Sequence, residues 1–165
     1  MKRKRKLLRT LAAWIIAVNA VPATFSEEFR GKVIGVSDGD TITVLFQGEQ
    51  RKIRLSGIDC PEKSQDFGQQ AKAFTAKFAF AKKVKVISVG FDRYKRTIGE
   101  VILPNGKNLN NLLLSNGFAW FYEQYSKDLE KRALETTARK AKVGLWSHSD
   151  PRAPWAFRKQ SKIPH

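Results

Sequence analysis

Two short acidic segments, separated by a basic residue, occur in the first half of the chain. The first contains Asp38 and Asp40, the second contains Asp59 and Glu62, and Arg54 lies between them. Carboxylate oxygens bind hard divalent cations, and a guanidinium group can bind two phosphate oxygens at once. If the two segments meet in the fold, they provide metal ligands, a spare carboxylate and a phosphate-binding cation. Phosphodiester hydrolysis uses this combination of groups.

Three short runs of alternating apolar residues are placed to bring these segments together. Residues 32–36 and 41–46 are typical of strands, and residues 51–58 are typical of a third. In the third run, Arg54 would point away from the face formed by its apolar neighbours. If the first two runs form a hairpin and the third pairs with the second, the two acidic segments can meet.

The rest of the pattern predicts an α+β domain. Further strands are expected at 84–89 and 97–103, and helices at about 64–82, 108–115 and 127–142. Ser64 or Asp66 is expected to cap the first of these helices. Five short strands, with helices between and after them, favour a small Greek-key barrel.

Three motifs together resemble the staphylococcal nuclease (thermonuclease) family. They are Asp-Gly-Asp-Thr at 38–41, Ile-Arg-Leu-Ser-Gly-Ile-Asp-Cys-Pro-Glu at 53–62 and Asp-Arg-Tyr-Lys-Arg at 92–96. The resemblance is specific because all three occur in order at domain-like spacing, over residues 29–146. It implies a five-stranded OB-fold β-barrel with about three helices, in a domain at 29–147.

The resemblance implies a Ca²⁺ site made of oxygen ligands. Asp40 and Asp59 match the two ligand aspartates of the family, and the backbone carbonyl of Cys60 falls where the family uses a backbone oxygen. Asp38 matches a nearby acid that acts through water or by orienting the loop. A plain turn is the alternative interpretation of Asp-Gly-Asp, because both residue types are common in turns.

The resemblance also implies which groups act on the phosphate. Glu62 matches a glutamate that positions or deprotonates the attacking water, and Arg54 and Arg96 match the two arginines that bind the scissile phosphate. For Glu62 the alternative is an exposed surface acid. For Arg96 it is a solvated charge beside Arg93 and Lys95. Lys95 is a departure from the best-known member of the family, which has glycine there, so substrate preference stays open.

Aromatic residues are the candidates for contacts with the nucleotide. Tyr94 matches a tyrosine that touches the terminal phosphate, while Tyr122 and Tyr125 lie near the base-stacking position of the family. Stacking on an aromatic ring tolerates any base, so it would not by itself select a sequence. For the neighbouring Trp120 and Phe121, packing in the core is the favoured interpretation.

The chain is strongly basic. Its 165 residues carry a formal net charge of +16, and a surplus of ten remains without the six positive charges in the first ten residues. Such a surplus favours nucleic acid or an acidic membrane surface as a partner. A basic protein with no such partner is the alternative. Cys60 is the only cysteine, which excludes an intrachain disulfide.

Segment 1–23 is predicted to be a secretory signal peptide. Basic residues are concentrated in 1–9, an apolar run follows at 11–18, and small residues permit cleavage after Ala20 or Ala23. We therefore expect a secreted or periplasmic protein. The alternative is an uncleaved signal that anchors the protein in the inner membrane.

The C-terminal segment 148–165 is basic and rich in proline. This composition predicts an extended tail with loose terminal residues. Trp155 and Phe157 are expected to hold part of this tail against the domain.

These observations together predict a secreted, Ca²⁺-dependent nuclease that acts on DNA and RNA and is a monomer. The family resemblance implies that the products carry 3′-phosphates. The alternative is an OB-fold module that binds single-stranded nucleic acid without cleaving it. Such a module would not need the acids and arginines that this chain contains.

Overall fold

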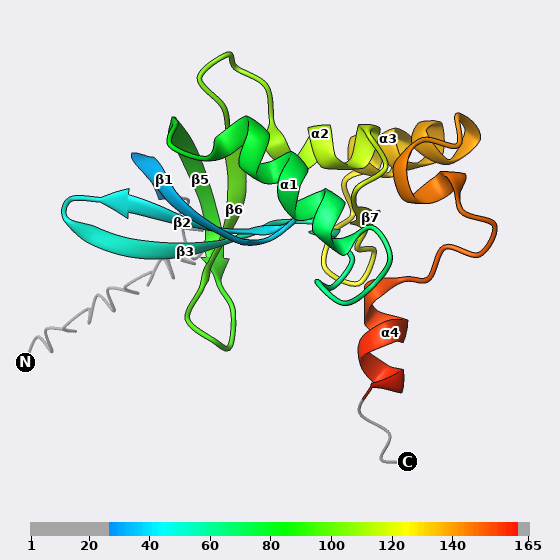
Figure 1. Ribbon diagram of the computed structural model, residues 1–165. Coiled ribbons are helices and arrows are strands. Elements are labelled where there is room, and N and C mark those ends of the chain that lie inside the picture. Colours follow the sequence, from blue (N-terminus) through cyan, green and yellow to red (C-terminus); the bar gives the residue numbers. More distant parts are fainter. Residues whose placement is uncertain (1–26, 162–165) are drawn as a thin grey trace, which may run out of the picture.

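The computed structural model describes residues 27–161, so the predicted signal peptide lies outside the described residues. Five strands form a closed barrel in the order β1-β2-β3-β6-β5, which confirms the predicted α+β fold with a five-stranded barrel (Figure 1). The barrel strands are β1 (Glu28–Asp38), β2 (Thr41–Phe46), β3 (Glu49–Leu55), β5 (Lys83–Phe91) and β6 (Thr97–Ile102).

The barrel closes around alternate residues of its strands. β1, β2 and β3 form an antiparallel meander, β3 pairs with β6 in parallel, and β5 joins β6 to β1. Ile42 and Val44 of β2 and Ile53 and Leu55 of β3 are fully buried in the barrel core. Successive side chains of a strand point to opposite faces, so Arg54 is directed away from this core.

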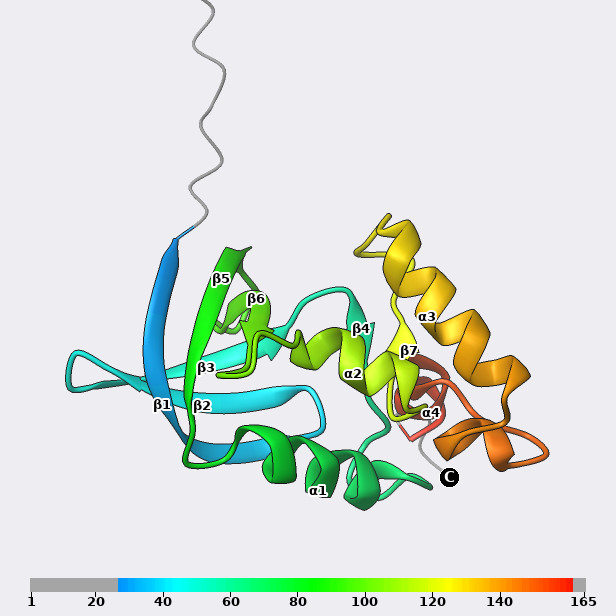
Figure 2. The ribbon, with the colours of Figure 1, turned by 90° about the horizontal axis from the view of Figure 1, so that it is seen from above.

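The helices are α1 (Gly68–Ala79), α2 (Leu109–Ser115), α3 (Leu129–Lys140) and α4 (Pro154–Gln160), with the 3₁₀-helix η1 (Gly144–Ser147) before α4. Figure 2 shows α1 along the barrel, with α2 lying between α1 and α3. Three of these helices correspond to those predicted from the sequence. No helix within residues 27–161 is long and apolar enough to cross a membrane.

The first helix begins later than predicted and without the predicted cap. It starts at Gly68, and Phe67 before it has a φ of 66° and makes no side-chain cap. Ser64 and Asp66 instead belong to the preceding loop. A Cβ atom at Gly68 would lie 1.8 Å from the carbonyl oxygen of Glu62. The loop therefore folds tightly back on Glu62, which a capping pattern does not reveal.

The predicted third strand is divided in two. β3 ends at Leu55, and Gly57 in the following turn has a φ of 71°, a conformation that glycine adopts readily. The two residues of β4 (Ile58–Asp59) then pair with β7 (Trp120–Phe121), with Asp59 opposite Trp120. The turn thus carries Asp59 off the barrel and into a separate two-stranded ladder.

The extended conformation expected for the C-terminal segment is wrong for α4. Pro154 occupies the first turn of this helix, where a missing backbone N–H costs nothing. Trp155 packs on Tyr122 and Trp120, which confirms its predicted contact with the domain. In Figure 1, α4 lies below β7 and apart from the barrel strands.

Candidate active site

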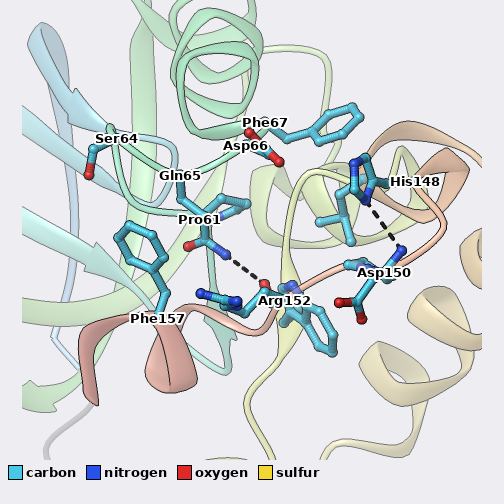
Figure 3. Close-up of a pocket in the computed structure, with 12 residues that line it drawn as sticks. Pro61, Ser64, Gln65, Asp66, Phe67, His148, Asp150, Arg152 and Phe157 are labelled. Atoms are coloured by element: carbon cyan, nitrogen blue, oxygen red, sulfur yellow. Dashed lines mark hydrogen bonds between the residues drawn. The ribbon is translucent and has the colours of Figure 1, made fainter. Parts of the chain in front are cut away.

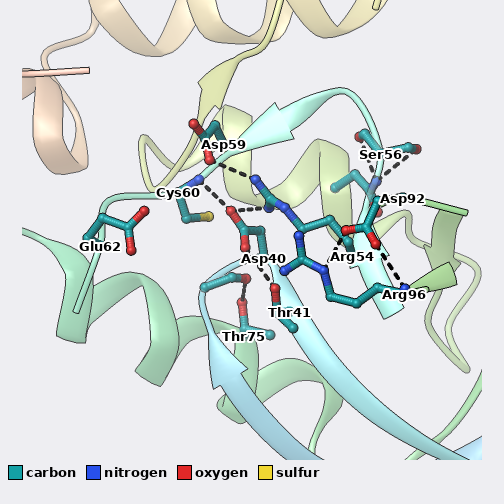
Figure 4. A network of polar contacts seen from close by, with 12 residues as sticks. Asp40, Thr41, Arg54, Ser56, Asp59, Cys60, Glu62, Thr75, Asp92 and Arg96 are labelled. Atoms are coloured by element: carbon teal, nitrogen blue, oxygen red, sulfur yellow. Dashed lines mark hydrogen bonds and ion pairs between the residues drawn. The ribbon is translucent and has the colours of Figure 1, made fainter. Parts of the chain in front are cut away.

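The two acidic segments meet at one end of the barrel, as predicted (Figure 4). The amide of Cys60 donates a hydrogen bond to Asp40 Oδ2 over 2.7 Å. Arg54 forms an ion pair with Asp40 and donates from Nη2 to Asp59 Oδ1 over 2.7 Å. One guanidinium group therefore joins the two carboxylates that were predicted to bind metal.

The strand register accounts for this geometry. Thr41, which follows Asp40, pairs with Arg54 across β2 and β3, and the amide of Leu55 donates to the Asp40 carbonyl over 2.9 Å. Arg54 therefore reaches the turn that holds Asp40. Asp59 is almost completely buried, with 1% of its side chain exposed, so its charge depends on the partners around it.

Gly39 is required here for space. A Cβ atom at this position would lie 2.8 Å from Ala71 Cβ and 2.9 Å from Cys60 Cβ. The hydroxyl of Thr75 also donates to the Gly39 carbonyl, so α1 packs directly on the turn between β1 and β2. The close approach of α1 fixes the acidic turn.

A buried polar network, which the sequence did not predict, holds the turn that leads to Asp59. Asn110 of α2 is fully buried, and its side-chain amide donates to the carbonyls of Ser56 and Gly99 over 3.0 and 3.3 Å. Lys131 of α3 pairs with Glu100 over 3.1 Å, and Ser56 donates to the same carboxylate. Helices α2 and α3 thus hold the turn that leads into β4. An isolated asparagine or lysine in a helix gives no sequence signal of such a role.

Arg96 lies at the same end of the barrel as Arg54, because Thr97, which follows it, pairs with Ile53 of β3. Its Nε donates to Asp92 Oδ2 over 2.6 Å. Although burial acts in the opposite direction, hydrogen bonds from Arg96 and Tyr94 hold the pKa of Asp92 below its usual value. Asp92 therefore fixes the direction of the Arg96 side chain.

Glu62 lies at the edge of the cluster, and its carboxylate contacts a residue that the sequence analysis missed. Arg158 of α4 donates from Nη1 to Glu62 Oε1 over 2.7 Å and from Nη2 to Asp59 Oδ2 over 2.7 Å. The hydrogen bond to Asp59 is the main reason why the pKa of Arg158 lies above its ordinary value. No local sequence pattern identifies Arg158, because it is one of several basic residues in the C-terminal segment.

Burial raises the pKa of three acidic groups around the cluster. It raises the pKa of Asp59, against which Arg158 and Arg54 act, and it raises the pKa of the Cys60 thiol strongly. It also raises the pKa of Asp38, whose carboxylate lies 3.9 Å from Lys63 Nζ. The site thus combines partly desolvated carboxylates with guanidinium groups that compensate their charge.

The predicted aromatic contacts are not equivalent. Tyr94 is 65% exposed and lies between Arg93 and Arg96, whose guanidinium carbons are 4.8 and 5.6 Å from its ring centroid. Tyr122 is partly buried, and Trp155 stacks on it with an interplanar angle of 3°. Tyr125 is 72% exposed. Tyr125 and Tyr94 are therefore better placed than Tyr122 to contact a ligand.

The predicted metal ligands supply only part of a coordination shell. Within residues 27–161, no three or more His, Cys, Asp and Glu side chains are grouped so as to hold a metal ion. Asp40, Asp59 and the Cys60 carbonyl offer only oxygen donors, which suit a hard cation such as Ca²⁺. Ca²⁺ takes about six to eight oxygen ligands, so water would complete the shell.

A pocket adjoins the site (Figure 3). It lies between the loop before α1 and the segment that leads into α4, and Pro61 and Phe157, the neighbours of Glu62 and Arg158, line it. Gln65 crosses it and donates to the Arg152 carbonyl over 2.6 Å. The loop that carries Glu62 and the C-terminal segment therefore line one pocket, and Gln65 bridges them across it.

Comparison with known proteins gives a consistent set of relatives. Residues 52–148 match the sequence profile described as Staphylococcal nuclease homologue. The chain is 37% identical over 172 residues to a protein of Shigella flexneri named Micrococcal nuclease, with 98% of both chains covered. It is 41% identical over 131 residues to an uncharacterized endonuclease of Escherichia coli, covering 79% of this chain and 86% of the relative. An uncharacterized endonuclease of Haemophilus influenzae is 38% identical over 160 residues, covering 96% and 88% respectively.

Proposed function

Because this chain belongs to the staphylococcal nuclease family, we propose that it is a hydrolytic nuclease that cleaves phosphodiester bonds in nucleic acid. The cluster in which Arg54 joins Asp40 to Asp59, with Glu62 at its edge, is the observation that carries this proposal. It contains the carboxylates and cations that attack on a phosphodiester requires. The full-length similarity to relatives named as nucleases supports the same activity.

The finer proposal is a Ca²⁺-dependent nuclease that acts on both DNA and RNA. Water attacks the phosphorus atom, the 5′ oxygen leaves, and the product carries a 3′-phosphate. The surplus of ten positive charges that remains without the first ten residues supports a polyanionic substrate. Both polymers present the same phosphodiester group to the proposed site.

Asp40, Asp59 and the carbonyl of Cys60 would hold the cation, and Asp38 would bind through water or orient the loop. When bound, a cation of this type polarises a phosphoryl oxygen and offsets the charge that develops on it. Asp40 and Asp59 are already drawn together by Arg54, so the chain itself positions these oxygen atoms.

Arg54 and Arg96 would bind the non-bridging oxygens of the scissile phosphate. Asp92 holds Arg96 through Nε, so the two Nη atoms can face a phosphate. Negative charge on the phosphate oxygens grows in the pentacoordinate transition state, and preorganised cations stabilise it there. By analogy with other phosphate-binding arginines, losing either could lower the rate by about 10³-fold or more.

Glu62 would position or deprotonate the attacking water. About a third of its side chain is exposed, at 36%, so water can reach the carboxylate. General-base catalysis of this type contributes roughly 10²- to 10⁴-fold to a rate. Exposed Tyr94 and Tyr125 would contact the phosphate and base of the substrate, and Tyr122 would do so only beside Trp155.

Export is part of the proposal. Cleavage of the signal segment after Ala20 or Ala23 would give a mature chain that begins at Val21 or Thr24. Mass spectrometry of the periplasmic or extracellular protein would detect either N-terminus. An intact Met1 in the membrane fraction would instead support the anchored form.

The activity is tested by incubating the purified protein with DNA and with RNA, in Ca²⁺ and in chelator. We expect cleavage of both polymers in Ca²⁺ and none in chelator, with 3′-phosphate ends that a phosphatase removes. Tight binding without cleavage under every condition would favour the single-strand-binding OB-fold module. Equal cleavage in Ca²⁺ and chelator would contradict the metal dependence alone.

A further inference from the structure

Helix α4 lies outside the segment that matches the family profile, which ends at residue 148. It nevertheless supplies a guanidinium group to the proposed active site. Arg158 Nη1 lies 2.7 Å from Glu62 Oε1 and 3.3 Å from Asp59 Oδ1, and Nη2 lies 2.7 Å from Asp59 Oδ2. The two nitrogens thus span a proposed metal ligand and the proposed water-activating group.

We propose that Arg158 is a positioning residue for Glu62, and that α4 completes the active site of this nuclease. This inference rests on the proposed function. Among the described residues, Arg158 is the only partner found for the Glu62 carboxylate. A glutamate at a surface edge would otherwise sample several rotamers, because nothing else fixes its three side-chain torsions.

A second, separate link ties Glu62 to the same C-terminal segment. The Glu62 amide donates to Gln65 Oε1 over 3.2 Å, and Gln65 Nε2 donates to the Arg152 carbonyl over 2.6 Å (Figure 3). The backbone of Glu62 is thus connected to the start of the α4 segment, and its side chain to the end of α4. Both links would have to be maintained for the carboxylate to keep one position.

Aromatic contacts help to dock α4 on the domain. Trp155 and Arg158 are three residues apart, so they share one face of the helix. Trp155 stacks on Tyr122 at a centroid distance of 5.1 Å and packs edge-on against Trp120 at 5.6 Å. This aromatic contact sets the position of the helix, and the helix in turn directs Arg158 at the carboxylates.

A purely stabilising role explains this geometry less well. Arg158 pairs with Glu62 through side chains that are 37% and 36% exposed, and an ion pair of that exposure adds little to folding. Its guanidinium group, however, forms two parallel hydrogen bonds to Asp59 and a third to Glu62. Paired, planar contacts of this kind fix the direction of the side chain as well as adding energy.

The test compares Arg158→Gln, Arg158→Lys and the matched control Lys159→Gln in the full chain, using steady-state cleavage of a DNA oligonucleotide over a range of substrate concentrations in saturating Ca²⁺. Lys159 is exposed on the same helix and contacts neither carboxylate in the described residues. We expect kcat to fall about 10- to 100-fold in Arg158→Gln with KM little changed, as for other residues that orient catalytic groups. Arg158→Lys should recover part of the loss, and Lys159→Gln should behave as wild type.

Calcium binding, measured by calorimetry, provides a readout other than activity. Arg158→Gln should bind Ca²⁺ at least as tightly as wild type, because a positive charge next to Asp59 is removed. Wild-type kcat in Arg158→Gln would overturn the inference and leave the nuclease assignment intact. Higher activity together with tighter Ca²⁺ binding would also overturn it, since α4 would then obstruct the site. No cleavage by the wild type would overturn the proposed function itself.

Discussion

Replacing Arg54 with methionine should destabilise the protein mainly when Ca²⁺ is absent. Arg54 has 16% of its side chain exposed and pairs with Asp40 and Asp59, whose side chains are 8% and 1% exposed. Removing one partner of a buried ion pair costs about 3–5 kcal/mol, because the remaining charge is left uncompensated. Asp59 keeps Arg158, so we expect the lower end of this range.

The expected loss corresponds to a clear shift in thermal unfolding. For a domain of this size, 1 kcal/mol lowers Tm by about 3 °C, so Arg54→Met in chelator should melt roughly 10 °C below wild type. Saturating Ca²⁺ should recover part of the difference, because a bound cation replaces the missing positive charge between the two carboxylates.

Differential scanning calorimetry in chelator and in Ca²⁺ measures both effects. Lys52→Met is the matched control, since Lys52 is an exposed residue of the same strand that forms no ion pair among the described residues. Its Tm should change by less than about 2 °C. A variant at Arg54 that melts like wild type in chelator would refute the idea that this guanidinium compensates the buried carboxylates. An equal loss of Tm in chelator and in Ca²⁺ would refute the idea that Ca²⁺ binds between the same two carboxylates that Arg54 joins.

Two further predictions follow from individual groups. Cys60 is 3% exposed and burial raises its thiol pKa, so iodoacetamide should leave the native protein unmodified and label it fully in denaturant. Mass spectrometry would detect the label. Rapid labelling of the native protein would contradict the burial of Cys60. Asp128 caps α3 and its pKa is lowered by the hydrogen bond from Lys131, so Asp128→Ala should cost about 1 kcal/mol in urea unfolding at neutral pH. That difference should shrink as the pH falls through the low pKa of folded Asp128, and a cost that did not depend on pH would exclude a charged cap.

The sequence was sufficient to predict the centre of the site because strand geometry is local. Because side chains alternate between the two faces of a strand, Arg54 points away from the face of Ile53 and Leu55. The hairpin from β1 to β2 brings Asp40 to the end of the same sheet. The register brings Arg54 to Asp40, while the turn at Gly57 and the pairing of β4 with β7 place Asp59 beside them. The chemical roles assigned to these residues remain predictions.

The features that the sequence did not predict depend on contacts between distant segments. Gly68 was not recognised as the start of α1, because the reason is its close approach to the Glu62 carbonyl. Arg158 was missed because contacts with distant segments, such as the stacking of Trp155 on Tyr122, bring α4 to the carboxylates. A Pro-rich, basic segment resembles an extended tail, and a helix of seven residues within it has too short an apolar pattern to detect.

The carboxylate and arginine cluster is the proposed active site of a hydrolytic nuclease, in which Glu62 acts on the attacking water. The most direct test measures cleavage rate and nucleic-acid binding of wild type and Glu62→Gln at one fixed concentration of salt and Ca²⁺. The glutamine keeps the size and hydrogen bonding of Glu62 but removes the base and one negative charge.

We predict that Glu62→Gln loses most of its cleavage rate while its affinity for nucleic acid is unchanged or slightly higher. Binding depends on the basic surface and on counterion release, which this substitution should barely alter. Cleavage by Glu62→Gln at the wild-type rate would remove Glu62 from the mechanism and contradict the account.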